Sequence, residues 1–165
     1  MIILFISSGL FLGWSLGAND ASNVFGSAVG SRLISFTRAA VIASVFVVLG
    51  AVLQGAGASA TLGRLGSVNA IGGAFTVALA AGLTVYFMTK AALPVSTTQA
   101  IVGAIIGWNF FTDNSVDIKS LTQIISTWIT GPVLGAAFAF SLYHLIKITR
   151  KKIKVHLLVY ESYIK

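Results

Sequence analysis

The amino-acid sequence predicts an all-α protein, a polytopic transmembrane helical bundle that contains broken or half helices. Hydrophobic residues make up 56% of the 165 residues and charged residues only 9%, whereas a soluble domain carries about 25% charged residues. The mean hydropathy is +0.93. Glycines recur four residues apart, a spacing that lets membrane helices approach one another closely. These glycines are Gly9, Gly13 and Gly17, Gly26 and Gly30, Gly103 and Gly107, and Gly131 and Gly135.

Composition also limits the chemistry of the chain. Cysteine is absent, which excludes disulfides and thiolate metal sites. The net charge of +7 is concentrated in residues 147–165, which hold six basic residues and one acidic residue. This distribution is typical of a topology signal, so we expect membrane lipid and no nucleic acid as a partner. No nucleophile–base pair or phosphate-binding loop can be assembled, so we expect neither an enzyme nor a cofactor.

The first apolar run, Ile2–Leu16, is too short to cross a membrane comfortably. Its 15 residues make about 22 Å of helix, against a hydrocarbon core of about 30 Å. The polar stretch Gly17–Asn23 follows, and Val24–Ile34 resumes a small-residue helix. We therefore expect a broken helix whose irregular part faces protein or a cavity. Met1–Leu16 lacks a basic amino-terminal region, so we expect a retained segment and not a signal peptide.

Asp20 lies in the middle of this polar stretch. A carboxylate in hydrocarbon costs several kcal/mol, so an intramembrane Asp is a functional-site hypothesis by default. Asn19, Ser22 and Asn23 supply amide and hydroxyl groups beside it, which together suit an ion site. The alternative interpretation is a capped turn at a membrane surface.

The middle of the chain predicts two spans joined by a short loop. Ala39–Ala58 is the first, and its Gln54 suits an interhelical hydrogen bond better than a direct ligand contact. Thr61–Val68 is the expected loop, and Asn69–Met88 is the second span. Lys90 follows that span, and it either extends to the membrane interface or contacts an anion.

A second polar stretch, Pro94–Gln99, interrupts the next apolar region. Proline near a first turn, followed by Ser96, Thr97 and Thr98, predicts a capped helix start. The length of the apolar segment up to Phe110 suits either a crossing or a re-entrant half-helix.

The remaining chain predicts a polar loop, a long span and a basic tail. The loop covers Phe111–Ser120, and the span Leu121–Ile146 contains Pro132 as an expected kink. We divide the chain into a transmembrane repeat half, residues 1–146, and a basic cytoplasmic tail or linker start, residues 147–165. Five crossings with the tail in the cytoplasm put the amino terminus outside.

The two polar stretches are expected to meet in one site. A half-helix that begins near Thr97 offers unpaired N–H groups and a positive dipole end, and its neighbouring hydroxyls suit a tetrahedral oxyanion. A carboxylate beside an anion is repulsive, so Asp20 requires a cation or a proton as well. Sodium fits a shell of carboxylate, amide, hydroxyl and backbone oxygens by analogy with other hard cations.

These residues carry a family resemblance. The stretch Gly17–Gly30, GANDASNVFGSAVG, resembles the GANDxxNxFG signature of the inorganic phosphate transporter (PiT) family, and Leu93–Ala104, LPVSTTQAIVGA, resembles its second signature. The resemblance covers most of Leu10–Asn109. It implies a phosphate symporter coupled to sodium or protons, with two inverted repeats around a central site.

The resemblance also implies residue roles. The sodium ligands would be Asp20, Asn19 and Asn23; the phosphate ligands would be Ser96, Thr97, Thr98 and Asn23. Gln99 stands where the family usually has histidine. Because glutamine does not titrate, this difference favours sodium over a proton as the coupling ion.

Each signature occurs once here, whereas family members usually carry both twice. The chain is therefore predicted to be one inverted-repeat half, with about five membrane segments, of a transporter that works by alternating access. We expect it to be a fragment, a separately encoded half, or a half that self-associates as a homodimer, and we favour the fragment. The partner is then a second half from the same or another chain. The alternative functions are transport of another oxyanion such as sulfate, and a non-transporting membrane subunit.

Overall fold

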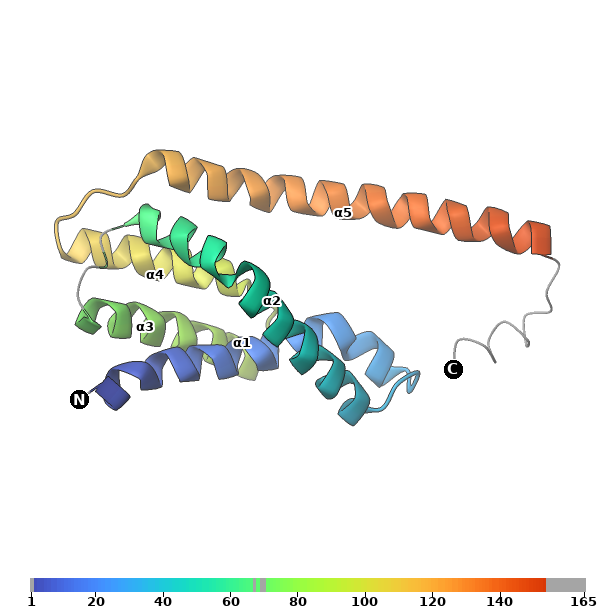
Figure 1. Cartoon of the computed structure of the whole chain (residues 1–165), viewed down its shortest axis with the longest axis horizontal. Helices are drawn as coiled ribbons and strands as arrows, with labels where there is room; N and C mark the ends of the chain where they lie inside the picture. Colours follow the sequence, from blue (N-terminus) through green and yellow to red (C-terminus); the bar gives the residue numbers. More distant parts are fainter. Residues whose placement is uncertain (1, 67, 69–70, 154–165) are drawn as a thin grey trace. The chain divides into compact units, whose positions relative to one another are not determined.

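The computed structural model describes residues 2–66, 68 and 71–153, and within them it contains helices and no strand (Figure 1). The all-α prediction is confirmed. The helices are α1 (Ile2–Gly30), α2 (Phe36–Leu65), α3 (Ile71–Lys90), α4 (Thr97–Phe111) and α5 (Ile118–Ile153). The chain divides into two compact units, one up to Ser120 and one from Leu121 onward. The first unit holds α1 to α4, and the described part of the second is most of α5.

Helix α1 is continuous through the polar stretch, so the predicted break at Gly17–Asn23 is wrong. The helix tolerates a glycine there, because Gly in a helix interior costs only about 1 kcal/mol relative to Ala. The polar side chains are accommodated without unwinding. The Ser22 hydroxyl donates to the Asn19 carbonyl inside the helix, at 2.8 Å. The Asn19 amide finds its partners on other segments.

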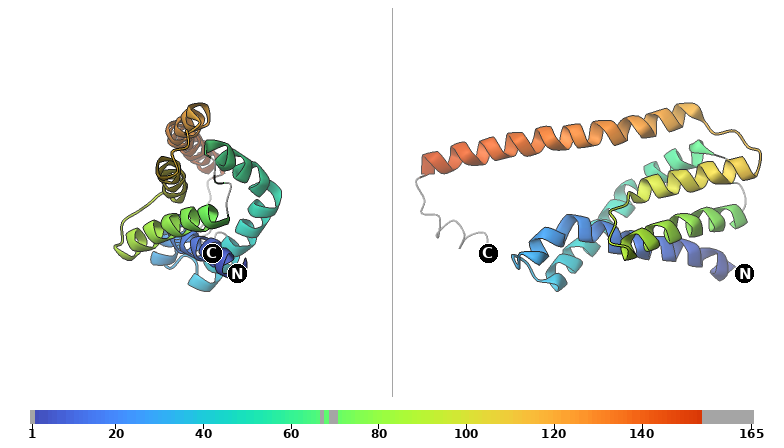
Figure 2. Two further views of the ribbon diagram at one scale, coloured as in Figure 1. Left: turned by 90° about the vertical axis from the view of Figure 1, so that its left-hand side faces the viewer. Right: turned by 180° about the vertical axis from the view of Figure 1, so that it is seen from behind.

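The core of the first unit lies along α3, which packs against α1 on one side and α4 on the other (Figure 2). Two glycines of α3 permit close approach. A Cβ on Gly82 would lie 2.8 Å from Cδ1 of Phe11, and a Cβ on Gly73 would lie 2.7 Å from Cζ2 of Trp108. The buried apolar side chains at these contacts are small or branched: Val77, Ala81, Val85, Val102 and Ile105.

Helix α2 extends further than its pattern suggests. The predicted loop Thr61–Val68 is wrong for Thr61 to Leu65, which are helical, while residues 67, 69 and 70 lie outside the described residues. Leu65 is fully buried, and the Thr61 hydroxyl donates to the Gly57 carbonyl at 3.0 Å. These contacts favour a helical last turn. The carbonyl of Leu65 accepts a hydrogen bond from the Asp117 N–H at 3.1 Å.

The predicted helix start after Pro94 is confirmed. Helix α4 begins at Thr97, and its N-cap is Ser96, whose hydroxyl accepts from the Gln99 N–H at 3.3 Å. Residues 91–96, which link α3 to α4, are not helical. Helix α4 has 15 residues, about 22 Å at 1.5 Å per residue, which remains the length of a half-helix.

Helix α5 is one uninterrupted α-helix that contains Pro132 (Figure 1). It begins at Ile118, three residues before the predicted span, and it continues past Ile146 to Ile153. Asp117 caps its first turn: the carboxylate accepts from the hydroxyl of Ser120 at 2.6 Å and from two backbone N–H groups. The Ser120 hydroxyl bond is the main cause that lowers the pKa of the Asp117 carboxyl below its usual value.

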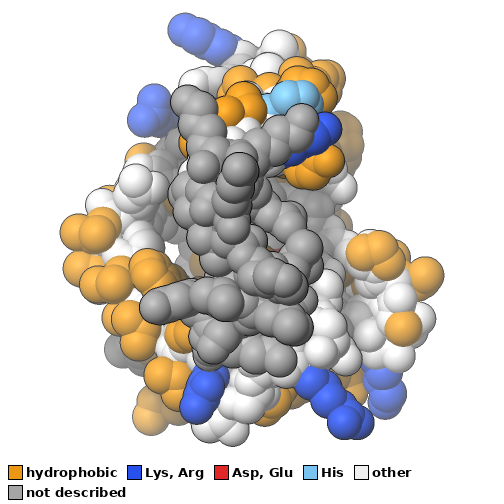
Figure 3. Space-filling model, turned by 90° about the vertical axis from the view of Figure 1, so that its right-hand side faces the viewer, with side chains coloured by type: hydrophobic (Ala, Val, Ile, Leu, Met, Phe, Trp, Pro, Cys, Tyr) orange, Lys and Arg blue, Asp and Glu red, His pale blue; other side chains and the backbone are white. Residues whose placement is uncertain are grey.

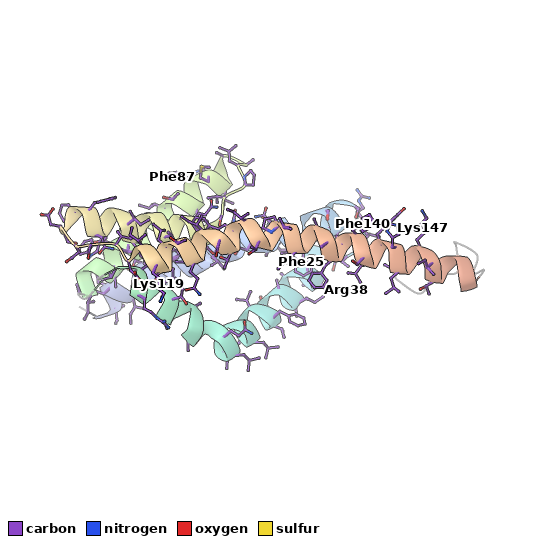
Figure 4. All side chains as sticks on the ribbon, turned by 90° about the horizontal axis from the view of Figure 1, so that it is seen from above. Phe25, Arg38, Phe87, Lys119, Phe140 and Lys147 are labelled. Atoms are coloured by element: carbon purple, nitrogen blue, oxygen red, sulfur yellow. The ribbon has the colours of Figure 1, made fainter. Side chains whose placement is uncertain are left out.

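Three of the described helices are long and apolar enough to cross a membrane, namely α2, α3 and Ile118–Thr149 of α5. Their side chains are largely uncovered. No residue in the most apolar part of α5 is buried, and only 6% of the corresponding part of α2 is. Figure 3 shows patches of hydrophobic side chains on the surface around the grey residues. Phe87 and Phe140, labelled in Figure 4, are both exposed. Such surfaces are expected of a protein solvated by lipid.

Candidate functional site

The amide of Asn19 is the centre of a buried polar cluster. This side chain is 3% exposed. Its Nδ2 donates to Oδ1 of Asp20 at 2.8 Å and to the Val95 carbonyl at 2.9 Å. Its Oδ1 accepts from the Thr89 hydroxyl at 3.3 Å. One side chain of α1 is thereby bonded to the last turn of α3 and to the segment that leads into α4.

The two polar stretches predicted to meet do lie together. The Thr97 hydroxyl donates to Oδ2 of Asp20 at 3.4 Å, a long hydrogen bond. Thr97 is 7% exposed and Asp20 is half-buried. Since Thr97 is the first residue of α4, the Asp20 carboxylate lies at the positive end of that helix dipole, where a negative charge is stabilised.

The other predicted site residues are close to the cluster along the chain, since Ser96 and Thr98 flank Thr97 and Asn23 lies one turn after Asn19 on α1. Ser96, Thr98 and Asn23 are all exposed. The Ser96 oxygen caps α4, and its O–H proton remains available because a hydroxyl both donates and accepts. The structure therefore brings Asn19, Asp20 and Thr97 into direct contact and leaves the three remaining side chains accessible.

Two members of the cluster were not predicted from the sequence, the Thr89 hydroxyl and the Val95 carbonyl. Thr89 stands at the end of an apolar helix beside Lys90, and nothing local distinguishes it from a threonine bonded within its own helix. A backbone carbonyl carries no sequence signal at all. Both are recognised only from the tertiary contact.

The remaining polar candidates lie apart from the cluster. Gln54 is exposed on α2, and its predicted interhelical bond stays a prediction. Nζ of Lys90 lies 5.7 Å from the centre of the Tyr86 ring, a cation–π contact. This contact with an amphipathic ring is typical of a lysine at a membrane interface.

A cation at Asp20 would draw on oxygen ligands of several kinds. Among the residues that the structure describes, no three His, Cys, Asp or Glu side chains gather closely enough to hold a metal ion. An ionised carboxylate has about four acceptor positions, and the cluster uses two of those on Asp20. The same cluster contains the Thr97 hydroxyl, the Asn19 amide oxygen and the Val95 carbonyl, and oxygens of these kinds are the ligands of hard cations.

The long apolar helices and the polar cluster at the α1–α4 contact define a multi-pass α-helical membrane protein. Residues 16–164 match the family model described as the phosphate transporter family, and the chain belongs to this family. This finding confirms the resemblance seen in the two signatures.

Several curated relatives match most of the chain. A protein named "Putative phosphate permease" from Chlamydia trachomatis is 32% identical over 158 residues, which cover 89% of this chain and 37% of the relative. A protein of the same description from Thermococcus kodakarensis is 33% identical over 153 residues, which cover 86% of this chain and 37% of the relative. A protein named "Putative phosphate permease" from Haemophilus influenzae is 33% identical over 147 residues, which cover 82% of this chain and 35% of the relative. The chain thus spans little more than a third of these relatives. No solved structure gives a significant match.

Proposed function

We propose that this chain forms one half of a transporter that moves inorganic phosphate across the membrane by alternating access, together with a coupling cation. The observation that carries the proposal is the contact between the Asp20 carboxylate and the Thr97 hydroxyl at the start of α4. It pairs a cation-binding group with the end of a helix that attracts anions. The names of the family and of its relatives supply the substrate.

Phosphate would bind at the start of α4. The hydroxyls of Ser96, Thr97 and Thr98 and the first N–H groups of the helix are the donors, and the Asn23 amide adds another. The Ser96 oxygen accepts from the Gln99 N–H, and its own proton can be donated to a ligand without loss of the cap. The Thr97 proton is shared with Asp20 over 3.4 Å, and a bond of that length is readily exchanged for one to phosphate.

The coupling cation would bind at Asp20. Oxygens of Asn19 or Asn23 complete its shell, and the positive charge of the cation reduces the repulsion between phosphate and the carboxylate. Gln99 does not titrate, so we favour sodium and keep the proton as the alternative.

The second half of the transporter would come from the same or another chain. Relatives nearly three times as long as the matched region support a two-repeat arrangement. An odd number of crossings would place the second half upside down in the membrane. The basic residues at the carboxyl end would then lie in the cytoplasm and the amino terminus outside.

Uptake of labelled phosphate into reconstituted vesicles tests the proposal. An inward sodium gradient should drive faster uptake than an equal potassium gradient. Equal rates would remove sodium coupling, and a pH jump with no sodium would then test protons. Excess unlabelled sulfate should compete poorly; strong competition would indicate a broader oxyanion transporter. If the chain moves phosphate only when a second half is supplied, the half-transporter arrangement is supported, and no uptake under either condition would indicate a non-transporting subunit.

A further inference from the structure

We propose that Thr89 and Asn19 are positioning residues that clamp the segment 91–96 and thereby hold Asp20 at the start of α4. The inference concerns residues that act through others, since neither side chain needs to touch phosphate. Its consequences for transport rest on the function proposed above, whereas the clamp itself is a property of the fold.

The Asn19 side chain has committed all its donors. Both Nδ2 protons are used, one on Asp20 and one on the Val95 carbonyl. If Oδ1 and Nδ2 of Asn19 were exchanged, the amide oxygen would face two other acceptors, the Asp20 carboxylate and the Val95 carbonyl. The hydrogen bonds therefore fix the orientation of the Asn19 amide. At 3% exposed, the amide is also shielded from water that could replace these partners. Asn19 thus acts as a cross-link first, and any contribution to a cation shell is limited to the remaining lone pair of Oδ1.

Thr89 is singled out by comparison with the other threonines of α3. Thr76 and Thr84 donate to carbonyls four residues earlier in the same helix, those of Gly72 and Ala80, at 2.9 Å. Thr89 instead donates across to Asn19 on α1. Its hydroxyl therefore joins two helices, as a donor to the Asn19 amide oxygen.

The segment that the clamp holds has little regular structure of its own. It connects α3 to α4, and it contains Ala92 at a φ of 56°, in the left-handed region that costs a non-glycine residue energy. Pro94 removes one backbone donor from it. The Val95 carbonyl, one residue before the N-cap, is fixed by Asn19 at 2.9 Å. The clamp thus sets where the first turn of α4 lies relative to Asp20.

The chain offers a matched set of variants. Thr89→Val removes the hydroxyl and keeps the shape, Thr89→Ser restores the hydroxyl, and Thr84→Val makes the same change on the same helix without a cross-helix bond. A lost hydrogen bond of ordinary strength corresponds to about a three- to tenfold change in an equilibrium. We expect Thr89→Val to raise the KM for phosphate by about that factor with little change in the maximal rate. Thr89→Ser and Thr84→Val should match the unmodified chain. A KM of Thr89→Val equal to that of Thr84→Val would overturn the proposed role.

A second measurement does not depend on transport. Hydrogen exchange of the purified chain in lipid nanodiscs reports the opening of residues 88–99 directly. Thr89→Val should exchange about three- to tenfold faster there than Thr84→Val, because the clamp is weakened. Equal exchange would overturn the clamp. If the unmodified chain takes up no phosphate either alone or with a second half supplied, while Thr89→Val still accelerates exchange, the clamp stands and the proposed function fails.

Discussion

Replacement of Asn19 by alanine is the most severe single change that the polar cluster predicts. It removes a side chain that is 3% exposed and that makes hydrogen bonds to Asp20, Val95 and Thr89. The Val95 carbonyl and one Asp20 oxygen lose a donor in a place that water does not reach freely. The fold should therefore be weakened even when phosphate and cation are absent.

The size of the effect follows from the three bonds. A hydrogen bond to a charged group contributes about 1.5–3 kcal/mol and a neutral one about 0.5–1.5 kcal/mol. In membrane proteins the measured average is lower, at about 0.6 kcal/mol for each bond. Between these limits, we expect Asn19→Ala to lower the free energy of unfolding by about 2–4 kcal/mol. Asn23→Ala, one turn further along α1 and exposed, should cost less than about 0.5 kcal/mol.

Unfolding of the purified chain by SDS in mild detergent micelles, followed by tryptophan fluorescence, measures both variants. The chain has three tryptophans, and Trp14 and Trp108 lie on α1 and α4, so their emission reports on the first unit. Identical unfolding curves for the two variants would refute the view that Asn19 connects α1, α3 and the segment before α4.

Two further predictions concern packing and capping. Gly82→Ala should lower the free energy of unfolding by about 1–3 kcal/mol, because its Cβ would lie 2.8 Å from Phe11 Cδ1 and 3.3 Å from the Leu12 Cα. The control in the same SDS titration is Gly103→Ala, where a Cβ meets nothing within 4 Å. Equal losses of unfolding free energy in the two variants would contradict the close helix contact. Asp117→Ala should speed hydrogen exchange in the first turn of α5 at neutral pH, whereas Asp113→Ala should not. Folding lowers the pKa of Asp117 below its ordinary value of 3.8. The ionised carboxylate therefore stabilises the fold fully above pH 3.8, and this stabilisation is lost as the pH falls through the lowered pKa. The difference between Asp117→Ala and the unmodified chain should therefore vanish at acid pH, and a difference that persists there would rule out the ionised cap.

The sequence was most informative where local chemistry decides the structure. Ser96 has the side chain of a good N-cap and stands two residues after Pro94, so the start of α4 could be predicted to within two residues. The contact between Asp20 and Thr97 could be predicted for a different reason, because polar groups in an apolar chain must find one another.

The sequence was least informative where a distant partner decides the structure. Gly17 and its polar neighbours were expected to interrupt α1, yet Asn19 satisfies its amide on Val95 and Thr89, which lie at least 70 residues away along the chain. The helix therefore has no need to open. Likewise, α2 continues to Leu65 because that side chain is buried in the fold, a tertiary effect that overrides a polar, glycine-containing pattern.

Sodium-driven phosphate uptake by Asp20→Asn tests most directly the claim that the carboxylate and the start of α4 form one transport site. The measurement uses the vesicles and gradient described above, with Asp113→Asn as the control because that aspartate lies exposed in the loop before α5. We predict that Asp20→Asn abolishes the response to sodium, since a neutral amide cannot balance the cation, while Asp113→Asn retains it. Sodium-driven uptake by Asp20→Asn at the rate of the unmodified chain would contradict the account.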